Sequence, residues 1–321
     1  MNLLTEMIRP GLAKIAFLLF MVCLFKTRAY PIDTGADFLK FGIGARPSAM
    51  GEASVSLHSD VTAAYWNPAG LAKIRRIQCG AMYSEAVKDA FLNFFGLALP
   101  LKGLGTVEVS GLLLYIEPIP VTLTSGETSG KLKWADWAFT LSYGREVMRG
   151  LSFGLGFKAI QRIESDPIYG TTRGRAYSGD FGFIYEFPFK RGLNLGFSLA
   201  NVGNSLKMEG EIKRDDLPRT IRLGLSYSEH SWAIASDANK ILDDQWRIHI
   251  GGEYKFKDTV FARFGYYDKA GNVRGETYGI GIKLKNYEFD WANVPAGEMV
   301  GYTRDNRVSI IVHLGYAHDS P

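Results

Sequence analysis

Histidines are the first residues to examine for chemistry, because imidazole is a common metal ligand and general base. The chain holds five, and none stands at a spacing typical of a metal site: His58, His230, His249, His313 and His318. Ser309 would share a strand face with His313, but a pair of this kind is expected by chance, and a hydrolytic site also needs a carboxylate in the right geometry. We therefore predict no metal site and no catalytic residue.

Two further patterns are weak signals for cofactor binding or acid–base catalysis. The Gly42-x-Gly44 pair lacks the third glycine of a dinucleotide-binding loop and follows no buried strand. Glu288 and Asp290 alternate along an expected strand, which places both carboxylates on one face, as ionic partners inside a barrel would be. The residues thus predict no cofactor and a protein that is not an enzyme.

The step Asn67-Pro68-Ala69-Gly70 is the most distinctive short motif of the chain. Asn can cap or turn the backbone, Pro fixes its φ angle, and Gly can adopt a positive φ. These are properties of a built turn rather than of reactive groups. We predict that the motif is a structural latch or gate.

The chain after residue 76 alternates between apolar and polar side chains, which is the pattern of β-strands. In residues 246–256, Ile250 and Tyr254 fall on an apolar face, and Arg247 and Glu253 on a polar one. Such segments recur about fourteen times, an even number, as a closed antiparallel barrel of the bacterial outer membrane requires. The predicted strands are 76–84, 90–99, 104–116, 133–146, 150–163, 174–187, 193–203, 219–228, 231–239, 245–256, 260–268, 275–284, 287–294 and 305–316.

The lengths of the connections support the same fold class. They are short after even-numbered strands, as at 101–103 and 148–149, and mostly longer after odd-numbered strands, as at 117–132 and 204–219. Outer-membrane barrels alternate in this way, with short turns in the periplasm and long loops outside the cell. The pattern predicts an all-β protein, a membrane-spanning antiparallel β-barrel of about 14 strands.

Charge decides which strand face meets the lipid. A Lys or Arg on the lipid face near the bilayer midplane costs about 2–4 kcal/mol. A slip of one residue in strand 245–256 would turn Arg247 and Lys255 outward, at a cost of roughly 4–8 kcal/mol if both lay deep, which is comparable to the net stability of a domain. The polar face must therefore line or fill the interior, with Glu108, Asp136, Asp180, Arg222, Arg247, Glu253, Arg263 and Glu288.

The N-terminus predicts export. Arg9 and Lys14 precede an apolar run at 15–25. At about 11 residues this run is too short to span a bilayer as a helix but suits the core of a signal peptide. Small residues three positions and one position before the cut favour cleavage after Ala29, so we predict a signal peptide at 1–29.

Charge and cysteine content exclude two classes of protein. The net charge is +4, but residues 1–29 hold four basic residues and one acidic residue, so the remainder is close to neutral. A nucleic-acid-binding domain would need a basic surface that this remainder does not supply. Once the signal peptide is removed, Cys79 is the only cysteine, and no internal disulfide can form.

Residues 30–75 are predicted to fill the barrel. Eight strands close on their own side chains and sixteen leave an aqueous channel, so about fourteen strands leave a lumen. Residues 30–75 precede the first strand, lack its alternation and contain the Asn67-Pro68-Ala69-Gly70 motif. We predict three regions: a signal peptide at 1–29, an N-terminal plug or hatch at 30–75, and a transmembrane barrel at 76–321.

The run 34–74 resembles the N-terminal signature of the PorV/PorQ outer-membrane family. That family is similar in turn to the FadL-type fatty-acid channels, which share the Asn-Pro-Ala-Gly step. The chain departs from such barrels at its end, where residues 317–321 follow Tyr316, which we take as the terminal aromatic residue. Later segments extend the resemblance over nearly the whole mature chain: Asn201-Val202-Gly203, Leu217-Pro218-Arg219, Gly252-Glu253-Tyr254, and Asp290 with Val294-Pro295.

The resemblance implies an integral protein in the outer membrane of a Gram-negative (diderm) bacterium, with outer-membrane lipid around it. It implies either of two functions. The first is passage of hydrophobic solutes across the outer membrane. The second is a non-channel, accessory role in type IX-like protein secretion, in which the barrel accepts secreted proteins from secretion-system components and holds them at the cell surface. The loops 117–132 and 204–219 do not decide between the two.

Overall fold

A computed structural model describes residues 34–57, 60–87, 89–242, 244–269, 273–296 and 304–315. The predicted signal peptide at 1–29, the first four residues of the predicted plug, and Tyr316 lie outside the described residues. Strands dominate the described chain, and its helices are short. No helix among these residues is long and apolar enough to cross a membrane.

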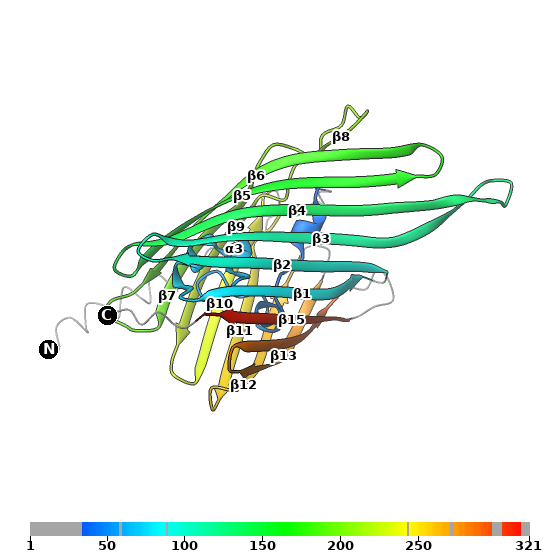
Figure 1. The fold of residues 1–321 in the computed structure, drawn as a ribbon. Coiled ribbons are helices and arrows are strands. Elements are labelled where there is room, and N and C mark those ends of the chain that lie inside the picture. The colour runs from blue at the N-terminus through cyan, green and yellow to red at the C-terminus, as the bar shows by residue number, and fades with distance from the viewer. Residues whose placement is uncertain are drawn as a thin grey trace.

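Fourteen antiparallel strands form a closed barrel, as predicted (Figure 1). Each strand pairs with its neighbours along the chain, and the first strand pairs with the last. A two-residue strand, β8 (Lys207–Met208), lies in the loop before β9 and pairs with β6. The barrel strands are β1 (Ile77–Val87), β2 (Ala90–Leu101), β3 (Gly105–Thr122), β4 (Thr128–Met148), β5 (Leu151–Asp166), β6 (Gly170–Glu186), β7 (Leu193–Gly203), β9 (Thr220–Ser228), β10 (Trp232–Ile241), β11 (Arg247–Phe256), β12 (Val260–Asp268), β13 (Arg274–Leu284), β14 (Tyr287–Pro295) and β15 (Arg304–Leu314).

The barrel is taller on one side than the sequence predicts. The expected irregular loop at 117–132 is mostly a continuation of β3 and β4, which have 18 and 21 residues. A tilted strand needs about 9–11 residues to cross a bilayer, so this hairpin projects beyond it. In Figure 1 the β3–β4 hairpin extends past the neighbouring strands. In the structure, Pro118 lies at a register shift between Ile116 and Ile119, and Pro120 pairs with Lys131 in the continued ladder.

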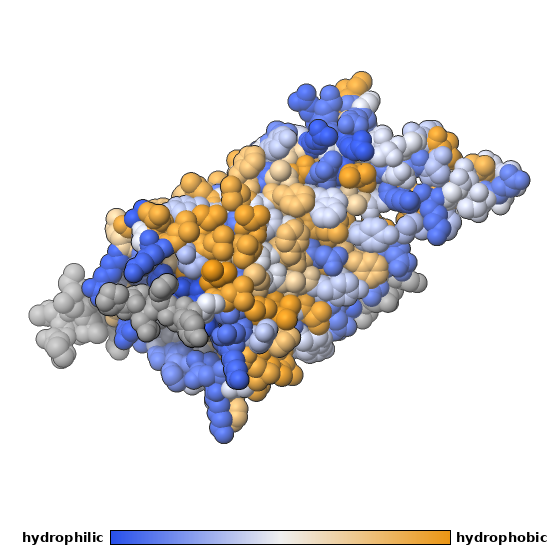
Figure 2. Space-filling view, viewed as in Figure 1, coloured by the Kyte–Doolittle hydropathy of each residue, from blue (hydrophilic) through white to orange (hydrophobic). Residues whose placement is uncertain are grey.

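The outer face of the barrel is apolar. In β11, Ile250 and Tyr254 are more than half exposed, whereas His249 and Gly251, which flank Ile250, are buried. Figure 2 shows apolar residues gathered in a band across the barrel, with hydrophilic residues toward both ends. An apolar surface of this extent is unstable in water and suited to lipid, which confirms a membrane-spanning barrel.

The described part of the N-terminal segment lies inside the barrel and is almost wholly buried. Its backbone runs from the long-loop end, where the Gly35 amide donates to the Asp216 carbonyl at 3.0 Å, to the short-turn end, where Lys73 pairs with Glu186. It forms only short helical turns: η1 (Asp37–Lys40), α2 (Ala45–Ala49), α3 (Ala63–Trp66) and η2 (Pro68–Lys73). We call residues 34–75 the plug.

Inward-facing glycines let the plug backbone approach the barrel wall. A Cβ at Gly196 would lie 2.5 Å from the carbonyl oxygen of Val55, and one at Gly251 would collide with Met50. Only glycine permits such contact between two backbones. Strand register aligns these glycines around the barrel in the sets Gly80–Gly96, Gly144–Gly154–Gly182, Gly196–Gly224 and Gly251–Gly265.

Candidate functional site

Asn67 connects two parts of the plug to the barrel wall. Its side-chain amide donates to the carbonyl oxygen of Val55 at 2.8 Å and to that of Phe183 in β6 at 3.0 Å. Its side-chain oxygen accepts from the Ala69 amide at 3.1 Å and so caps η2, in which Pro68 holds the first position. The side chain is 1% exposed, so all three bonds are made away from solvent.

Glycines in the barrel wall leave room for the motif. A Cβ at Gly182 would collide with the Asn67 side-chain oxygen, and a Cβ at Gly154 with the Pro68 backbone. Gly70, predicted to supply a positive φ, does not: it lies within η2 and its φ is not positive. The motif is therefore an Asn cap and a Pro-initiated turn, and its glycine is buried in the packing.

A chain of buried ion pairs fastens α2 to the wall formed by β11–β14. The Arg46 guanidinium donates to both carboxylate oxygens of Glu253, each at 3.0 Å. Glu253 also accepts from Arg263 at 2.6 Å, and Arg263 reaches Asp290 at 2.5 Å. Burial alone lowers the pKa of Arg46, but Glu253 and Asp60 raise it above its ordinary value, so Arg46 remains charged.

A second buried cluster surrounds Glu52, just beyond α2. Its carboxylate pairs with Lys269 at 2.5 Å and with Arg307 at 3.4 Å. Burial alone raises the pKa of Glu52, but Lys269 and Arg307 bring that pKa below its ordinary value, so the carboxylate is ionised. Arg307 also pairs with Asp305 at 2.8 Å and donates to the Gly42 carbonyl oxygen at 2.9 Å. We call these two clusters the ionic clamp.

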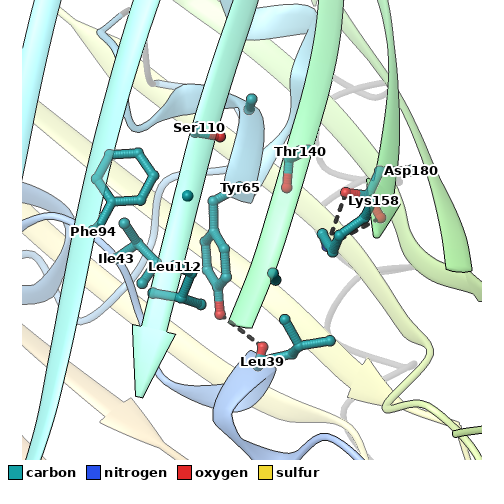
Figure 3. Close-up of a pocket in the computed structure, with 12 residues that line it drawn as sticks. Leu39, Ile43, Tyr65, Phe94, Ser110, Leu112, Thr140, Lys158 and Asp180 are labelled. Carbon is teal, nitrogen blue, oxygen red and sulfur yellow. Dashed lines mark hydrogen bonds and ion pairs between the residues drawn. The ribbon is translucent and has the colours of Figure 1, made fainter. Parts of the chain in front are cut away.

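The opposite side of the plug meets the wall through apolar contacts. There a small cavity of about 20 Å³ lies between the plug and β2–β6 (Figure 3). Tyr65 points along it, and its hydroxyl donates to the carbonyl oxygens of Leu39 and Phe41 at 2.9 and 2.7 Å. The cavity is lined by Leu39, Ile43, Ala64, Tyr65, Phe94, Ser110, Gly111, Leu112, Ala138, Thr140, Lys158 and Asp180.

One end of this cavity is polar. The Lys158 ammonium pairs with Asp180 at 3.1 Å and donates to the side-chain oxygen of Asn201 at 2.6 Å. The Asp180 carboxylate accepts a hydrogen bond from the backbone amide of Asn201 at 2.7 Å, where the register between β6 and β7 shifts. The cavity thus joins a hydrocarbon-like surface to one neutralised pair of charges.

The predicted interior residues occupy several distinct places. Most are buried, but Arg247 is partly exposed at the long-loop end of β11, where it pairs with Asp244 and Asp268. Asp136 pairs with Arg162, whereas one buried carboxylate oxygen of Glu108 has no hydrogen-bond partner among the described residues. Among the described residues, Glu253 and Arg263 form the only ion pair between two of these predicted residues, and Glu288 and Arg46 lie nearby.

Four residues of these contacts were not predicted from the sequence. Arg46 and Glu52 are the plug residues of the clamp, and two belong to the barrel wall: Arg307 in the clamp and Lys158 at the polar end of the cavity. Arg307 could have been found, because it falls on the polar face of the last predicted strand. Arg46 and Glu52 lie in irregular structure and carry no periodic signal. Among the described residues, no group of three or more His, Cys, Asp or Glu side chains could hold a metal ion.

Comparison with solved structures identifies the architecture. The toluene transporter TodX of Pseudomonas putida superimposes with a TM-score of 0.61 at 12% identity, over 89% of this chain and 98% of that one. The CymD monoaromatic hydrocarbon channel gives 0.61 at 12% identity, over 86% and 99%. A FadL homologue of Pseudomonas aeruginosa gives 0.54 at 13% identity, over 90% and 100%.

The comparisons establish the fold alone, because sequence identity is so low. No protein-family model and no curated protein matches the chain. The shared architecture, together with the apolar outer face, identifies an outer-membrane β-barrel.

Proposed function

We propose that this chain is a PorV/PorQ-type, FadL-like barrel that passes hydrophobic solutes across the outer membrane of a Gram-negative bacterium, and that it is not an enzyme. The observation that supports the proposal best is the apolar cavity between the plug and β2–β6. Structures of similar fold include a toluene transporter and a monoaromatic hydrocarbon channel. The substrate class we assign is therefore small, largely apolar molecules.

The distribution of contacts favours a path on one side of the plug. Between α2 and β11–β15 the plug is fixed by buried ion pairs, whose separation would leave uncompensated charges. Against β2–β5 it meets Phe94, Leu112 and Ala138, and these apolar contacts can re-form around a hydrocarbon. A solute therefore displaces apolar side chains more easily than it separates the clamp.

The cavity as it stands is too small for such a solute. Its volume of about 20 Å³ has room for about one water molecule, whereas pockets for small organic ligands enclose about 300–1,000 Å³. Passage thus requires part of the plug to shift away from β2–β5. We assign residues 30–75 the role of a hatch and Asn67-Pro68-Ala69-Gly70 the role of its latch.

Uptake of toluene by intact cells tests this function. The barrel is expressed in a Gram-negative strain without hydrocarbon channels of its own, and the rate of labelled toluene entry is measured. Ala138→Leu adds carbon atoms to the cavity wall, and we expect it to lower uptake several-fold. Ala292→Leu is the matched control, because Ala292 is equally buried but packs against α2 on the clamp side.

Both variants must first reach the outer membrane as folded barrels, since overpacking itself costs about 1–3 kcal/mol. Uptake that matches the parent in Ala138→Leu, or that falls equally in both variants, contradicts a path along the cavity. Uptake no faster than in cells without the barrel contradicts the transport function altogether.

A further inference from the structure

The short-turn end of the barrel has a strongly basic rim. We define the rim as residues 73–76 and the turns at 101–105, 145–151, 186–193, 228–232, 255–260 and 283–287. These segments contain twelve Lys and Arg residues but only four Asp and Glu residues. Eight of the twelve cations are exposed: Arg75, Lys102, Arg145, Arg149, Lys190, Arg191, Lys257 and Lys285.

The opposite end of the barrel shows no such excess. The hairpin region 117–133 holds two basic and two acidic residues, and the loop 204–219 holds four of each. The short loops of a barrel have no structural need for Lys or Arg, because Gly, Asn and Asp serve turns better. The basic excess is therefore specific to one end.

Several of the rim cations lie on turns that are neighbours along the edge of the barrel. Because β12 pairs with β13, the turn carrying Lys257 lies beside the turn carrying Lys285. Arg76 then donates to the Asn286 side chain at 3.3 Å, which brings the start of β1 to the same edge. Lys257 and Lys285 have no ion-pair partner within the described part of the chain, so their charges face outward unneutralised.

Aromatic side chains on the lipid-facing surface border these cations. The Lys190 ammonium lies 4.7 Å from the ring centre of Tyr227, and the Lys257 ammonium 5.4 Å from that of Phe256. Outward-facing aromatic residues mark the depth of the membrane interface in barrels. The rim thus stands at the level of lipid headgroups, immediately beyond the apolar band.

We propose that this basic rim binds the phosphate headgroups of anionic phospholipids in the leaflet that faces the short turns. A soluble acidic partner would be served by one patch, whereas these cations are spread along the perimeter and follow the aromatic residues. Basic residues at an anionic membrane surface gain electrostatic attraction, and their long side chains can reach the phosphates. This inference concerns the outer rim and is independent of the proposed solute path.

Lipid binding to the purified barrel tests the inference. In micelles of a zwitterionic detergent doped with phosphatidylglycerol or with phosphatidylcholine, native mass spectrometry gives the apparent affinity for each lipid. The test variant combines Lys190→Gln, Arg191→Gln, Lys257→Gln and Lys285→Gln. We expect the preference for phosphatidylglycerol to fall by roughly fivefold for each neutralised cation.

The control variant has the same change in net charge at the other end of the barrel. It combines Lys131→Gln, Lys133→Gln, Lys207→Gln and Lys213→Gln, all exposed residues. We expect it to keep the preference of the parent. An equal loss in both variants, or no loss in the rim variant, overturns the proposal. Binding of soluble polyglutamate as tight as that of phosphatidylglycerol would also overturn it, in favour of an acidic protein partner.

Discussion

The side-chain amide of Asn67 donates a hydrogen bond to the carbonyl oxygen of Phe183, and this bond ties the plug to the barrel wall. Phe183 lies in β6 next to Gly182, where a Cβ would collide with the Asn67 side-chain oxygen. The same amide group binds Val55, so one side chain joins the wall, η2 and the loop before α3. The proposed latch therefore depends on polar contacts that no apolar residue can replace.

Asn67→Ala should loosen this latch. It removes three buried hydrogen bonds and leaves the Val55 and Phe183 carbonyl oxygens without that donor, at a cost of about 1–3 kcal/mol. The plug then leaves its position transiently. In planar bilayers we expect flickering conductance, intermediate between the nearly silent parent and a variant lacking residues 30–66. Asn204→Ala, at an exposed position, should stay as silent as the parent.

If deletion of residues 30–66 gives a correctly inserted barrel that conducts no more than the parent, the plug does not block ion flow. That outcome would remove the role of the plug as a hatch.

Gly182→Ala should displace the latch from the wall side. The new Cβ would collide with the Asn67 side-chain oxygen, and neither the backbone of β6 nor the buried plug can yield easily. Gly179→Ala is the matched control on the same strand, because its Cβ would meet nothing closer than 3.7 Å. Limited proteolysis of the plug in micelles should show faster cleavage for Gly182→Ala only. Equal rates in the two variants would mean that the wall does not hold the plug at this point.

The alternation of strand faces and the alternation of loop lengths sufficed to predict the barrel, because they have independent physical causes. Lipid selects Ile250 and Tyr254 on one face, while the interior selects His249 and Glu253 on the other, so the period of two is visible in the sequence. The extension of the β3–β4 hairpin beyond the membrane was not visible. Outside the bilayer its outward side chains are no longer selected by lipid, and its prolines suggest a loop.

For the candidate site, the sequence pattern indicates interior residues of the barrel strands but not the plug residues that contact them. Arg46 and Glu253 are 207 residues apart, and no local pattern marks Arg46 as the partner of an interior carboxylate. The glycines that admit the plug are equally hidden, because their alignment depends on strand register, which a shift of one residue would destroy. Within the plug, the sequence singled out only the Asn67 motif, as a built turn, and did not show its hydrogen bond to the wall.

Substitution on the lipid face should depend on depth. Ile250 lies in the middle of β11 and Phe256 at its short-turn end, and both are more than half exposed. Ile250→Arg should lower the free energy of unfolding by about 2–4 kcal/mol and Phe256→Arg by about 0–1 kcal/mol. Denaturant titration in liposomes measures both. Equal losses would mean that Phe256 lies as deep as Ile250 and that the strand crosses the bilayer differently.

The orientation of the barrel is a separate prediction. Long loops should face the cell exterior and short turns the periplasm. Single cysteines at Ser125, Glu209 and Lys190, all exposed, are introduced in a Cys79→Ser background. A membrane-impermeant maleimide on intact cells should label the cysteines at 125 and 209 but leave the one at 190 unlabelled. The reverse pattern would place the basic rim at the cell surface.

Arg46→Gln should weaken the clamp without breaking the barrel. The variant loses two charge-assisted hydrogen bonds of 3.0 Å to Glu253, which keeps Arg263 as a partner at 2.6 Å. Hydrogen bonds to charged groups contribute about 1.5–3 kcal/mol, so we expect a loss of that size in the free energy of unfolding. Denaturant titration in liposomes measures it.

The control for the clamp is Arg219→Gln, whose partner Asp216 is mostly exposed at 3.3 Å, and it should lose much less stability because solvent screens that pair. Arg46→Gln also tests which side of the plug the solute passes.

If the solute path follows β2–β5, Arg46→Gln should speed proteolysis of the plug but leave the preference for toluene over other solutes unchanged, because the cavity wall is untouched. A change in which solutes pass would instead place the path along the clamp, because only there does Arg46 contact the wall.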